Sequence, residues 1–582
     1  MRRLIHISLF MICLALCISC KRHGVVQLRL VATSDVHGNI FREDCLNGKE
    51  RDGSLAKFAS FIRQQRASNR NVIYIDAGDN LQGSVEAYQD LSAQLHRQSV
   101  VAEAFNELGC SASVLGNHDL AADGGGCDRF LRDAGFPVLA ANVFFERFGD
   151  YTPPYTILEV QGLRVAILGM TTPVAKYTLP WDNIREIEIR DLIETAGYWM
   201  PILRDEEKAD VIVGLIHSGL DSGCMDDEGV YENQVSALVR KVPGFDVIVY
   251  GHDHLPACMK TADCNGDSVL LINPGPFVRN AAVIDIKADF RGSDKPGILT
   301  SGYLQDITCE TPDRTFMKKM SGWYEDVKNY SDSIIGTAAV PLEGAGVLWR
   351  ESTAMDYVHS LQLKFNGADI SLSSPLFTST LIPAGDLRIR DLFSLYQYEN
   401  SMVSVMLKGS EVRDILEYSA SQFYNTVSDG SGTLLKTVTD ADGNKRLRVP
   451  LKALITAAGI DYVIDVTKPE GERVSVISMT GGKPFDSDRL YRTTINSFLY
   501  AGTGSGSLLF RYVGLRHKEM KERLNSSSLS DIRYRMITDF ATRKEGGLRV
   551  NVRRFSNWKL IPGQTVADCL ARDTVQLNII EN

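Results

Sequence analysis

Apart from its first twenty residues, the 582-residue sequence has no uninterrupted apolar stretch of the roughly 18 residues that a membrane-spanning helix requires. It also lacks an excess of basic residues: the net charge is −9, which gives no electrostatic footprint for a nucleic acid polymer. No cysteine spacing matches a zinc finger, and there is no internal repeat or low-complexity tract. We therefore expect no nucleic acid partner and no further membrane span.

The N-terminus carries the features of an export signal. Two arginines precede a mostly apolar stretch, Leu4–Ile18. The segment Leu16–Cys20 resembles the cleavage box of bacterial lipoproteins, with Cys17 at the position of the usual Leu. If this lipoprotein-type signal, residues 1–20, is processed in that way, Cys20 becomes the lipid-bearing N-terminus and holds an extracytoplasmic protein to a membrane, on the periplasmic or the outer side. The alternative is an ordinary signal peptide with a cysteine nearby, and we expect the chain to be a monomer.

Eight cysteines follow Cys20, and an even number outside the cytoplasm permits disulfides. They are Cys45, Cys110, Cys127, Cys224, Cys258, Cys264, Cys309 and Cys569. Cys258 and Cys264 flank a predicted hairpin and are the expected pair.

Five short polar clusters each follow an apolar run that we predict to be a buried strand of an α/β sheet. The runs are Leu28–Ala32, Val72–Ile75, Ala112–Leu115, Val211–Ile216 and Val247–Tyr250. The clusters are Asp35-Val36-His37, Gly78-Asp79-Asn80, Gly116-Asn117-His118-Asp119, His217-Ser218-Gly219 and Gly251-His252-Asp253-His254. Loops that leave the carboxyl ends of such strands lie along one edge of the sheet, where α/β proteins place their sites. The clusters can therefore converge, and their carboxylates, imidazoles and one amide suit a pair of divalent ions.

A single histidine at a strand end is more often a structural residue than a metal ligand. Here the five clusters occur in order, each pairs His, Asp or Asn with a flexible Gly, and together they hold five of the ten histidines. This combination favours a metal site over five unrelated structural residues.

The five clusters resemble the ordered sequence blocks of the calcineurin-like metallophosphoesterases. The resemblance implies two metal ions that share one carboxylate. The first ion would take Asp35, His37, Asp79 and His254, and the second would take Asp79, Asn117, His217 and His252. Two ions roughly 4 Å apart can clamp a phosphoryl oxygen and activate a water molecule. The number of histidines at the second ion favours Mn, Zn or Fe over Mg.

His118 has no ligand role in the family pattern, so the resemblance implies that it contacts the substrate phosphate and neutralises the leaving oxygen. In the nucleotidase branch such a histidine is usually oriented by an Asp three positions later, where this sequence has Ala121. Asp119 and Asp123 are both near enough in sequence to replace it, and the sequence does not choose between them.

At 582 residues the chain should hold two large domains. We expect a metallophosphoesterase domain over residues 25–308, a connecting helix over 309–334 and a second domain over 335–582. Stretches such as Gly385–Asn400 and Ala458–Thr467 resemble the C-terminal domain of secreted 5′-nucleotidases and of 2′,3′-cyclic-nucleotide 2′-phosphodiesterase/3′-nucleotidases. The implied fold class is α/β (α+β): a four-layer β-sandwich flanked by helices, followed by an α/β substrate domain.

In this family two aromatic side chains sandwich the nucleotide base. The matching positions are Tyr398 and Phe498, with Asn400 as a hydrogen-bonding partner of the base and Gly459 approaching the nucleoside through its backbone. An aromatic face stacks on any base with about 1–3 kcal/mol. Without the family pattern, the default reading of these aromatics is that they belong to the core.

One departure bears on the substrate. True 5′-nucleotidases carry an Asn-Gly-Gly-x-Arg stretch whose Arg meets the substrate, whereas this chain has Ser371–Phe377 there, without the Gly pair or the Arg. The cyclic-nucleotide branch also lacks that Arg, so we expect 2′,3′-cyclic nucleotides and 3′-nucleotides as substrates in nucleotide salvage. The alternatives are a 5′-nucleotidase that uses Arg388 or Arg390 instead, and a surface lipoprotein that binds nucleotides without turnover.

Overall fold

The computed structural model describes most of the chain beyond the N-terminal segment. The described residues are 24–91, 98–122, 126–145, 152–178, 187–225, 229–291, 295–376, 378–427, 431–440, 443–501, 513–515, 517–552 and 554–576. The predicted signal, residues 1–20, lies outside them together with Cys20, and so does Asp123.

The first domain is built on two six-stranded sheets that face each other. In spatial order, the first sheet consists of β16 (Gly297–Asp306), β15 (Asn280–Asp289), β1 (Val25–Thr33), β2 (Val72–Asp76), β3 (Cys110–Val114) and β4 (Val138–Leu139). The second consists of β13 (Ala257–Ala262), β14 (Ser268–Asn273), β12 (Val247–Tyr250), β9 (Val211–His217), β7 (Leu163–Thr171) and β6 (Tyr155–Val160). Apolar side chains such as Leu30, Ile167 and Val249 fill the space between the sheets and form one buried core.

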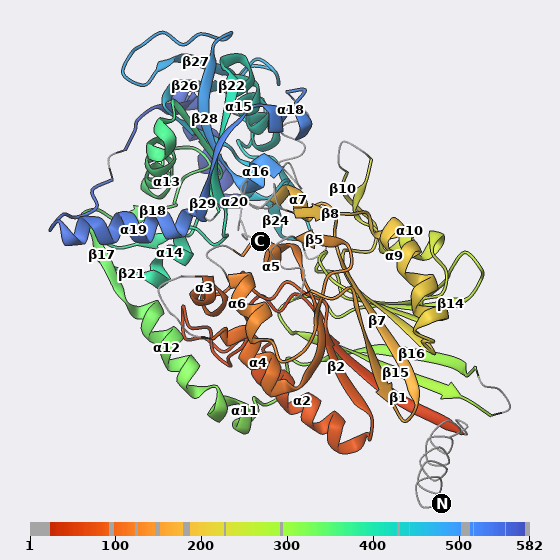
Figure 1. Cartoon of the computed structure of the whole chain (residues 1–582). Coiled ribbons are helices and arrows are strands. Elements are labelled where there is room, and N and C mark those ends of the chain that lie inside the picture. The colour runs from red at the N-terminus through yellow and green to blue at the C-terminus, as the bar shows by residue number, and fades with distance from the viewer. Residues whose placement is uncertain are drawn as a thin grey trace, which may run out of the picture.

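Helices cover the outer face of each sheet, so that the domain has four layers (Figure 1). They are α2 (Leu55–Ser68), α4 (Val100–Leu108) and α6 (Gly126–Asp133) on the first sheet, and α9 (Leu192–Pro201) and α10 (Val235–Lys241) on the second. Helix α2 begins where the Ser54 side chain accepts a hydrogen bond from the backbone N–H of Lys57, 3.3 Å away. The four-layer sandwich implied by the sequence is confirmed.

All five predicted runs are strands, but they belong to two sheets and not to one. Strands β1, β2 and β3 run parallel in the first sheet, and β9 and β12 run parallel in the second. The expectation of a single sheet edge is therefore wrong. The five clusters still converge, because the carboxyl ends of both sets of strands open on the same side of the sandwich.

The second domain has its own five-stranded sheet with a helix on each face. The spatial order is β25 (Thr456–Ala458), β19 (Ile370–Ser373), β28 (Leu490–Asn496), β22 (Ser401–Lys408) and β29 (Leu524–Asp531). Helix α13 (Thr353–Lys364) packs on one face, and α15 (Gly409–Phe423) packs on the other with Ile415 and Leu416 against Val405. A smaller sheet of β27 (Val474–Met479), β26 (Ile460–Asp465) and β30 (Trp558–Ile561) extends the domain, followed by α20 (Gly563–Gln576).

Two helices, α11 (Arg314–Lys319) and α12 (Ser321–Asp332), connect the domains and are fixed to the first one. The Ser331 hydroxyl donates to the Cys45 carbonyl over 3.0 Å, and the Tyr324 ring lies edge-on to Phe41 at 5.3 Å between centroids. Short strand pairs complete the fold: β5 (Val143–Phe145) with β8 (Ile187–Ile189), β17 (Ile334–Ala338) with β21 (Gly385–Arg388), β18 (Leu342–Glu343) with β20 (Leu381–Ile382), and β23 (Thr437–Thr439) with β24 (Lys445–Leu447).

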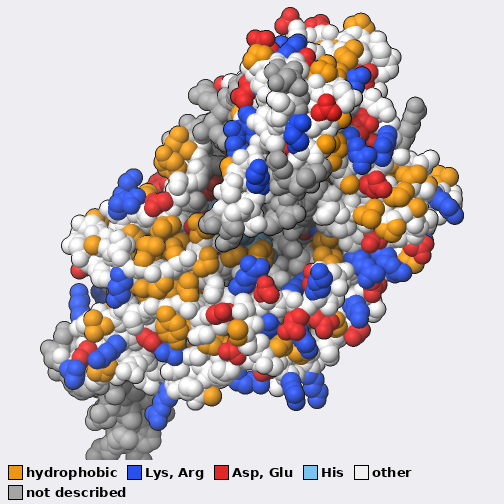
Figure 2. Space-filling model, turned by 180° about the vertical axis from the view of Figure 1, so that it is seen from behind, with side chains coloured by type: hydrophobic (Ala, Val, Ile, Leu, Met, Phe, Trp, Pro, Cys, Tyr) orange, Lys and Arg blue, Asp and Glu red, His pale blue; other side chains and the backbone are white. Residues whose placement is uncertain are grey.

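The surface carries both signs of charge. Figure 2 shows Lys and Arg side chains interspersed with Asp and Glu over the face opposite to that of Figure 1.

Within the described ranges, no helix is long and apolar enough to cross a membrane.

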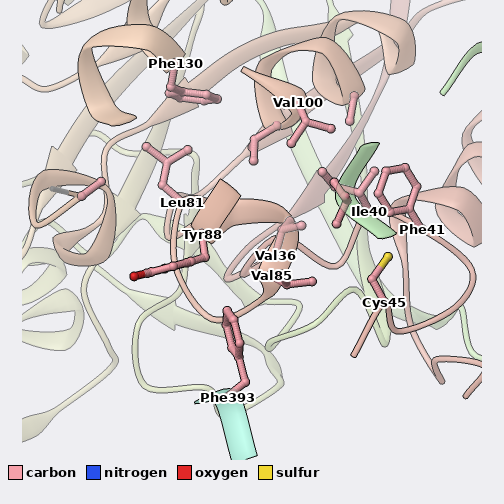
Figure 3. Close-up of a cluster of buried hydrophobic side chains, with 14 of the residues drawn as sticks. Val36, Ile40, Phe41, Cys45, Leu81, Val85, Tyr88, Val100, Phe130 and Phe393 are labelled. Carbon is pink, nitrogen blue, oxygen red and sulfur yellow. The ribbon is translucent and has the colours of Figure 1, made fainter. Parts of the chain in front are cut away.

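The two domains share a buried contact around Arg533, the second residue of α19 (Ile532–Glu545). Its guanidinium carbon lies 4.3 Å from the centre of the Tyr88 ring, on α3 (Val85–Leu91) of the first domain. It lies 3.9 Å from the Phe393 ring, on α14 (Ile389–Leu395) of the second, and forms an ion pair with Glu399. Figure 3 shows Tyr88 above Phe393 in this cluster, and their rings meet edge-on at 5.4 Å. Desolvated cation–π contacts of this kind contribute about 2 kcal/mol each.

The predicted disulfide between Cys258 and Cys264 is not formed, and both thiols are free and exposed. Strand β13 continues in extended form for four residues beyond Cys258, a distance of roughly 13 Å. Cys264 lies in the turn that follows, so the two Cα atoms exceed the separation of about 7 Å that a disulfide can bridge.

The buried His359 on α13 generates a prediction about acid stability. Its two ring nitrogens contact the hydroxyl oxygens of Ser371 (2.8 Å) and Thr456 (2.9 Å), and burial lowers its pKa to about 3. Below about pH 6.5 the His359 imidazole binds a proton in the unfolded chain but stays neutral in the folded one. The free energy of unfolding therefore falls as the pH drops below that value. Between pH 6 and pH 4 the free energy of unfolding of the wild type should fall by about 1.4 kcal/mol per pH unit more than that of His359→Gln.

Urea unfolding at several pH values measures this difference, and hydrogen exchange in α13 assigns the transition to the second domain. Parallel pH profiles for the two proteins would contradict a neutral, buried His359.

Candidate metal centre

The candidate ligands sit in loops with an unusual backbone. Asp35, His37, Asp79, His252 and His254 all have positive φ, between 49° and 79°. Non-glycine residues adopt this left-handed conformation rarely, and such strain concentrates at functional sites. Close approach adds a second constraint, because a side chain at Gly116 would meet the Asp79 Oδ1 atom at 2.0 Å.

Asp35, His37 and His254 form the first cluster of potential ligand atoms. The Nε2 atoms of His37 and His254 lie 3.2 Å apart, and His254 Nε2 is 3.3 Å from Asp35 Oδ1. The other ring nitrogen of His37, Nδ1, is 2.8 Å from the Gln82 carbonyl oxygen, which fixes the ring. Three donor atoms thus face one point, as a divalent ion requires.

Asp79, His217 and His252 form the second cluster, with Asn117 beside it. His217 Nε2 lies 3.0 Å from Asp79 Oδ2 and 3.2 Å from Asn117 Oδ1. Its Nδ1 atom is 2.7 Å from the Ala77 carbonyl oxygen. All seven residues predicted as metal ligands are therefore brought to two adjoining clusters.

Opposite charges on Asp79 and His217 stabilise the second cluster. Burial would raise the pKa of Asp79, but the neighbouring His217 and His118 outweigh it and hold that pKa well below its usual range. Burial would likewise lower the pKa of His217, but Asp79 raises it to about 10. In the chain by itself these two groups form a buried ion pair. The carboxylate, imidazole and amide donors fit a divalent ion, which would take the place of the imidazolium proton.

Asp119 does not orient His118. Its Oδ1 atom accepts from the backbone N–H groups of Asn80 (2.7 Å) and Leu81 (2.9 Å), and its Oδ2 atom accepts from those of Asp79 and Gly116 (2.9 Å each). Burial raises its pKa to about 6. Asp119 therefore holds together the loops that carry Asp79 and Asn117.

The partner of His118 is Gln82, whose Oε1 atom lies 2.5 Å from His118 Nδ1. An amide oxygen accepts, so Nδ1 donates and Nε2 is the nitrogen left to meet a substrate. His118 lies on the one-turn helix α5 (Asn117–Leu120), and its backbone N–H donates to Asp79 Oδ1 over 2.8 Å. Sequence reasoning missed Gln82, although it lies three residues after Asp79.

Three of the four predicted base-binding residues lie at one edge of the second domain's sheet. Asn400 precedes β22, and Phe498 lies on α16 (Ser497–Ala501) directly after β28. Tyr398 is exposed, at 43%, and Asn400 Nδ2 donates to the Tyr396 hydroxyl over 3.2 Å. Helix α16 contacts α7 (Ala175–Thr178) of the first domain, and α7 contacts α5, which carries His118. The edge therefore faces the metal centre.

Gly459 does not join this group. It follows β25, which runs antiparallel to β19, and thus lies at the opposite edge of the sheet. A side chain at Gly459 would meet the Asp369 carbonyl oxygen at 2.1 Å, so the glycine is required for packing between two strands.

A cavity of about 700 Å³ lies between the domains, next to the first cluster. Its wall in the first domain includes Phe277, whose ring is 5.6 Å from that of His37, and Gly83, which abuts the same histidine. Its wall in the second domain includes Arg390 and Gln397.

Two sheets with their ligands at converging strand ends, and a second domain facing them, define a two-domain metal-dependent phosphoesterase. Residues 28–256 match the family model of the calcineurin-like phosphoesterases, and residues 334–510 match that of the 5′-nucleotidase C-terminal domain. The chain is a metallophosphoesterase of the 5′-nucleotidase family.

Curated relatives agree with this assignment, and a solved structure shares the fold. The trifunctional nucleotide phosphoesterase protein YfkN of Bacillus subtilis is 25% identical over 92% of this chain, which spans 39% of that protein's length. The 2′,3′-cyclic-nucleotide 2′-phosphodiesterase/3′-nucleotidase of Yersinia enterocolitica is 24% identical over 88% of this chain and 86% of that protein. A Staphylococcus aureus protein solved in complex with alpha-ketoglutarate shares the fold, with a TM-score of 0.69 and 18% identity over 92% of this chain and 100% of that chain.

Asp79 generates the first prediction for this site. We expect Asp79→Asn to retain less than about a tenth of the phosphate release even with added Mn²⁺, because the lost charge would be shared by the two expected ions. Phosphate release and bound metal measure the effect, with Asp205→Asn, a distant exposed carboxylate, as the control. Full activity of Asp79→Asn would exclude a shared carboxylate.

His118 generates the second. His118→Ala should lower kcat by roughly 10²–10⁴-fold while the metal content stays normal, because we expect the imidazole to act on the leaving oxygen and not to bind an ion. Gln82→Leu should lower kcat in the same direction but less, since the ring remains and only its orientation is lost. A loss of bound metal in His118→Ala would make His118 a ligand instead.

Proposed function

We propose that the chain hydrolyses phosphate esters of extracytoplasmic nucleotides as a 2′,3′-cyclic-nucleotide 2′-phosphodiesterase/3′-nucleotidase, for nucleotide salvage and phosphate release. The observation that carries the proposal is the pair of adjoining ligand clusters that face an aromatic-bearing edge of a second domain. Three relatives with that printed activity support it, the one from Yersinia enterocolitica over 86% of its length.

Two ions would be held by this chain's own residues. Asp35, His37, Asp79 and His254 would hold the first, and Asp79, Asn117, His217 and His252 the second. Ions of this kind supply positive charge for phosphoryl oxygens and lower the pKa of a water molecule toward neutrality. The imidazole-rich donor set favours Mn, Zn or Fe over Mg.

His118 would act on the substrate itself. Gln82 holds its Nδ1–H, so that Nε2 is directed away from that contact. Burial lowers the pKa of His118 in the chain by itself, and a bound phosphate would raise it again. The charged ring would then neutralise the leaving oxygen, while Asp119 keeps the loop under it in place.

The second domain would select the nucleotide. Tyr398 and Phe498 would stack on the base, and Asn400 would hydrogen-bond to it. The buried hydroxyls of Ser373 and Ser374 have no hydrogen-bond partner within the described part of the chain. Ser373 is the last residue of β19 and Ser374 follows it, at the same edge of the sheet as Asn496, where a 5′-nucleotidase would present its Arg. This place in the sequence therefore holds neutral hydroxyls and no cation, and the cyclic-nucleotide branch of the family also lacks that Arg, which supports the cyclic and 3′-nucleotide substrates.

A 5′-nucleotidase activity is the second candidate, because Arg390 lines the cavity between the domains. Its Nη1 atom is paired with Asp332 Oδ1 at 2.7 Å, so part of its charge is already compensated. Arg388 is turned toward the Asp332 carbonyl oxygen of the connecting helix.

The proposed cellular location follows from the N-terminus: a lipid on Cys20 would hold the monomer at a membrane outside the cytoplasm.

A panel of nucleotides decides between the substrates. We expect phosphate release, coupled to a phosphatase for the cyclic esters, to be faster for 2′,3′-cyclic and 3′-nucleotides than for 5′-nucleotides. Chelation with EDTA should abolish the release. A preference for 5′-nucleotides that is lost in Arg390→Ala would establish the second candidate, and nucleotide binding without release would indicate a non-catalytic protein.

Base recognition gives a further prediction. Tyr398→Ala or Phe498→Ala should raise KM for nucleotides by roughly 5- to 150-fold with little change in kcat, because a stack of about 1–3 kcal/mol is lost equally from substrate and transition state. Hydrolysis of p-nitrophenyl phosphate, which has no base, should be nearly unchanged. Tyr198→Ala, which removes an aromatic that is 65% exposed on α9, serves as the control. Equal losses on both substrates would make the two aromatics structural.

A further inference from the structure

Three histidines of the two clusters, His37, His217 and His252, each use one ring nitrogen to contact an oxygen of a residue outside the clusters. His37 and His217 use Nδ1 for backbone carbonyl oxygens, those of Gln82 and Ala77. His252 differs, because its Nε2 atom lies 2.9 Å from a carboxylate oxygen, Oε1 of Glu232. A neutral carbonyl orients a ring, whereas a carboxylate also increases the electron density that the ring offers to a metal.

Glu232 comes from outside the five sequence clusters. It lies on β11 (Tyr231–Asn233), which pairs with β10 (Ser222–Met225) in a hairpin beside the site. Its carbonyl oxygen accepts from the hydroxyls of Thr172 (2.8 Å) and Ser218 (2.9 Å), so its backbone is anchored to the ends of β7 and β9. Its side chain is 18% exposed, which limits the screening of its charge by water.

Glu232 stands behind His252 and not among the ligands. The atoms that lie within 4.8 Å of one another belong to Asp79, His217 and His252, and Glu232 is described by the structure but is not one of that group. With Nε2 engaged by the carboxylate, Nδ1 is the His252 nitrogen that remains for an ion.

We propose that Glu232 is a positioning residue that holds the His252 ring with Nδ1 toward the second ion and strengthens it as a ligand. The inference rests on the proposed two-ion function. An outer carboxylate of this kind fixes the histidine tautomer, and its loss weakens metal binding by about 10- to 100-fold. The effect should be confined to the second ion, because Glu232 contacts His252, whereas His37 at the first ion is held by the Gln82 carbonyl oxygen.

Metal binding, measured without turnover, tests the proposal. Metal-free protein is titrated with Zn²⁺ against a chromogenic chelator, for the wild type, Glu232→Gln and Glu232→Ala. We expect the dissociation constant of one of the two ions to rise about 10- to 100-fold in both variants and that of the other to stay within about threefold. Glu232→Gln should lose less than Glu232→Ala, since its amide oxygen can still accept the Nε2 proton.

Two controls separate positioning from a general structural role. Asp221→Asn removes a carboxylate from the same hairpin region, paired there with Arg240 and Ser236, and should leave both constants unchanged. In a His252→Ala background, Glu232→Gln should cause no further loss, because the residue through which it acts is gone.

The outcomes are distinct. Two tightly bound ions in the wild type and unchanged constants in both variants would overturn the role of Glu232 and leave the proposed function standing. Fewer than two ions in the wild type would overturn both. Additive losses from Glu232→Gln and His252→Ala would show that Glu232 acts on the hairpin and not through His252.

Discussion

Four backbone N–H groups from two loops donate to a single buried carboxylate, that of Asp119. The loop after β2 and the start of α5 are thereby held as one unit, with Asp79 and Asn117 at its surface. Without that acceptor, four buried donors would be left unsatisfied, at about 1–3 kcal/mol each. The strained backbone of Asp79 and the close approach of Gly116 both depend on this bond network.

The two domains differ in the kind of side chain that each presents to the candidate site. The first supplies charge: carboxylates, imidazoles and the loops that hold them at the ends of parallel strands. The second supplies flat and neutral surfaces at one edge of its sheet. Arg533 and its aromatic neighbours join the two parts in a common core, so the distance between charge and surface is set by packing and not by a flexible tether.

The convergence of the candidate ligands could be predicted because the signals for it are local in the sequence. Each candidate lies within a few residues of a strand that the sequence marks with Val, Ile and Leu, as Asp35 and His252 do. The contacts that were predicted wrongly or not predicted at all join residues that are far apart in the sequence. From the sequence, Gly459 is expected to approach the nucleoside. In the structure it packs against the Asp369 carbonyl oxygen, a contact that the sequence does not reveal. Glu232 reaches His252 only through a hairpin whose position depends on β7 and β9.

The partner of His118 shows the same limit. Asp119 was a reasonable sequence candidate, since it is adjacent in the chain. On a one-turn helix, however, neighbouring side chains point in different directions, and the carboxylate turns toward backbone amides while the imidazole meets Gln82. Of the two carboxylates that proximity suggested, Asp119 is thus the wrong partner for His118, and Asp123 lies outside the described residues.

The pairing of β1 with β15 has a consequence for biogenesis. Leu30 lies opposite Ile284, and the Asp35 carbonyl oxygen accepts from the backbone N–H of Phe277 over 2.8 Å. At about 5–20 residues per second, a ribosome needs roughly 13–50 s to travel from one side of that ladder to the other. Throughout this interval the first strand lacks its antiparallel neighbour, and the loop with Asp35 and His37 has no fixed shape to offer an ion. Asp35 and His37 would therefore bind an ion only after β15 has been made and has joined the sheet.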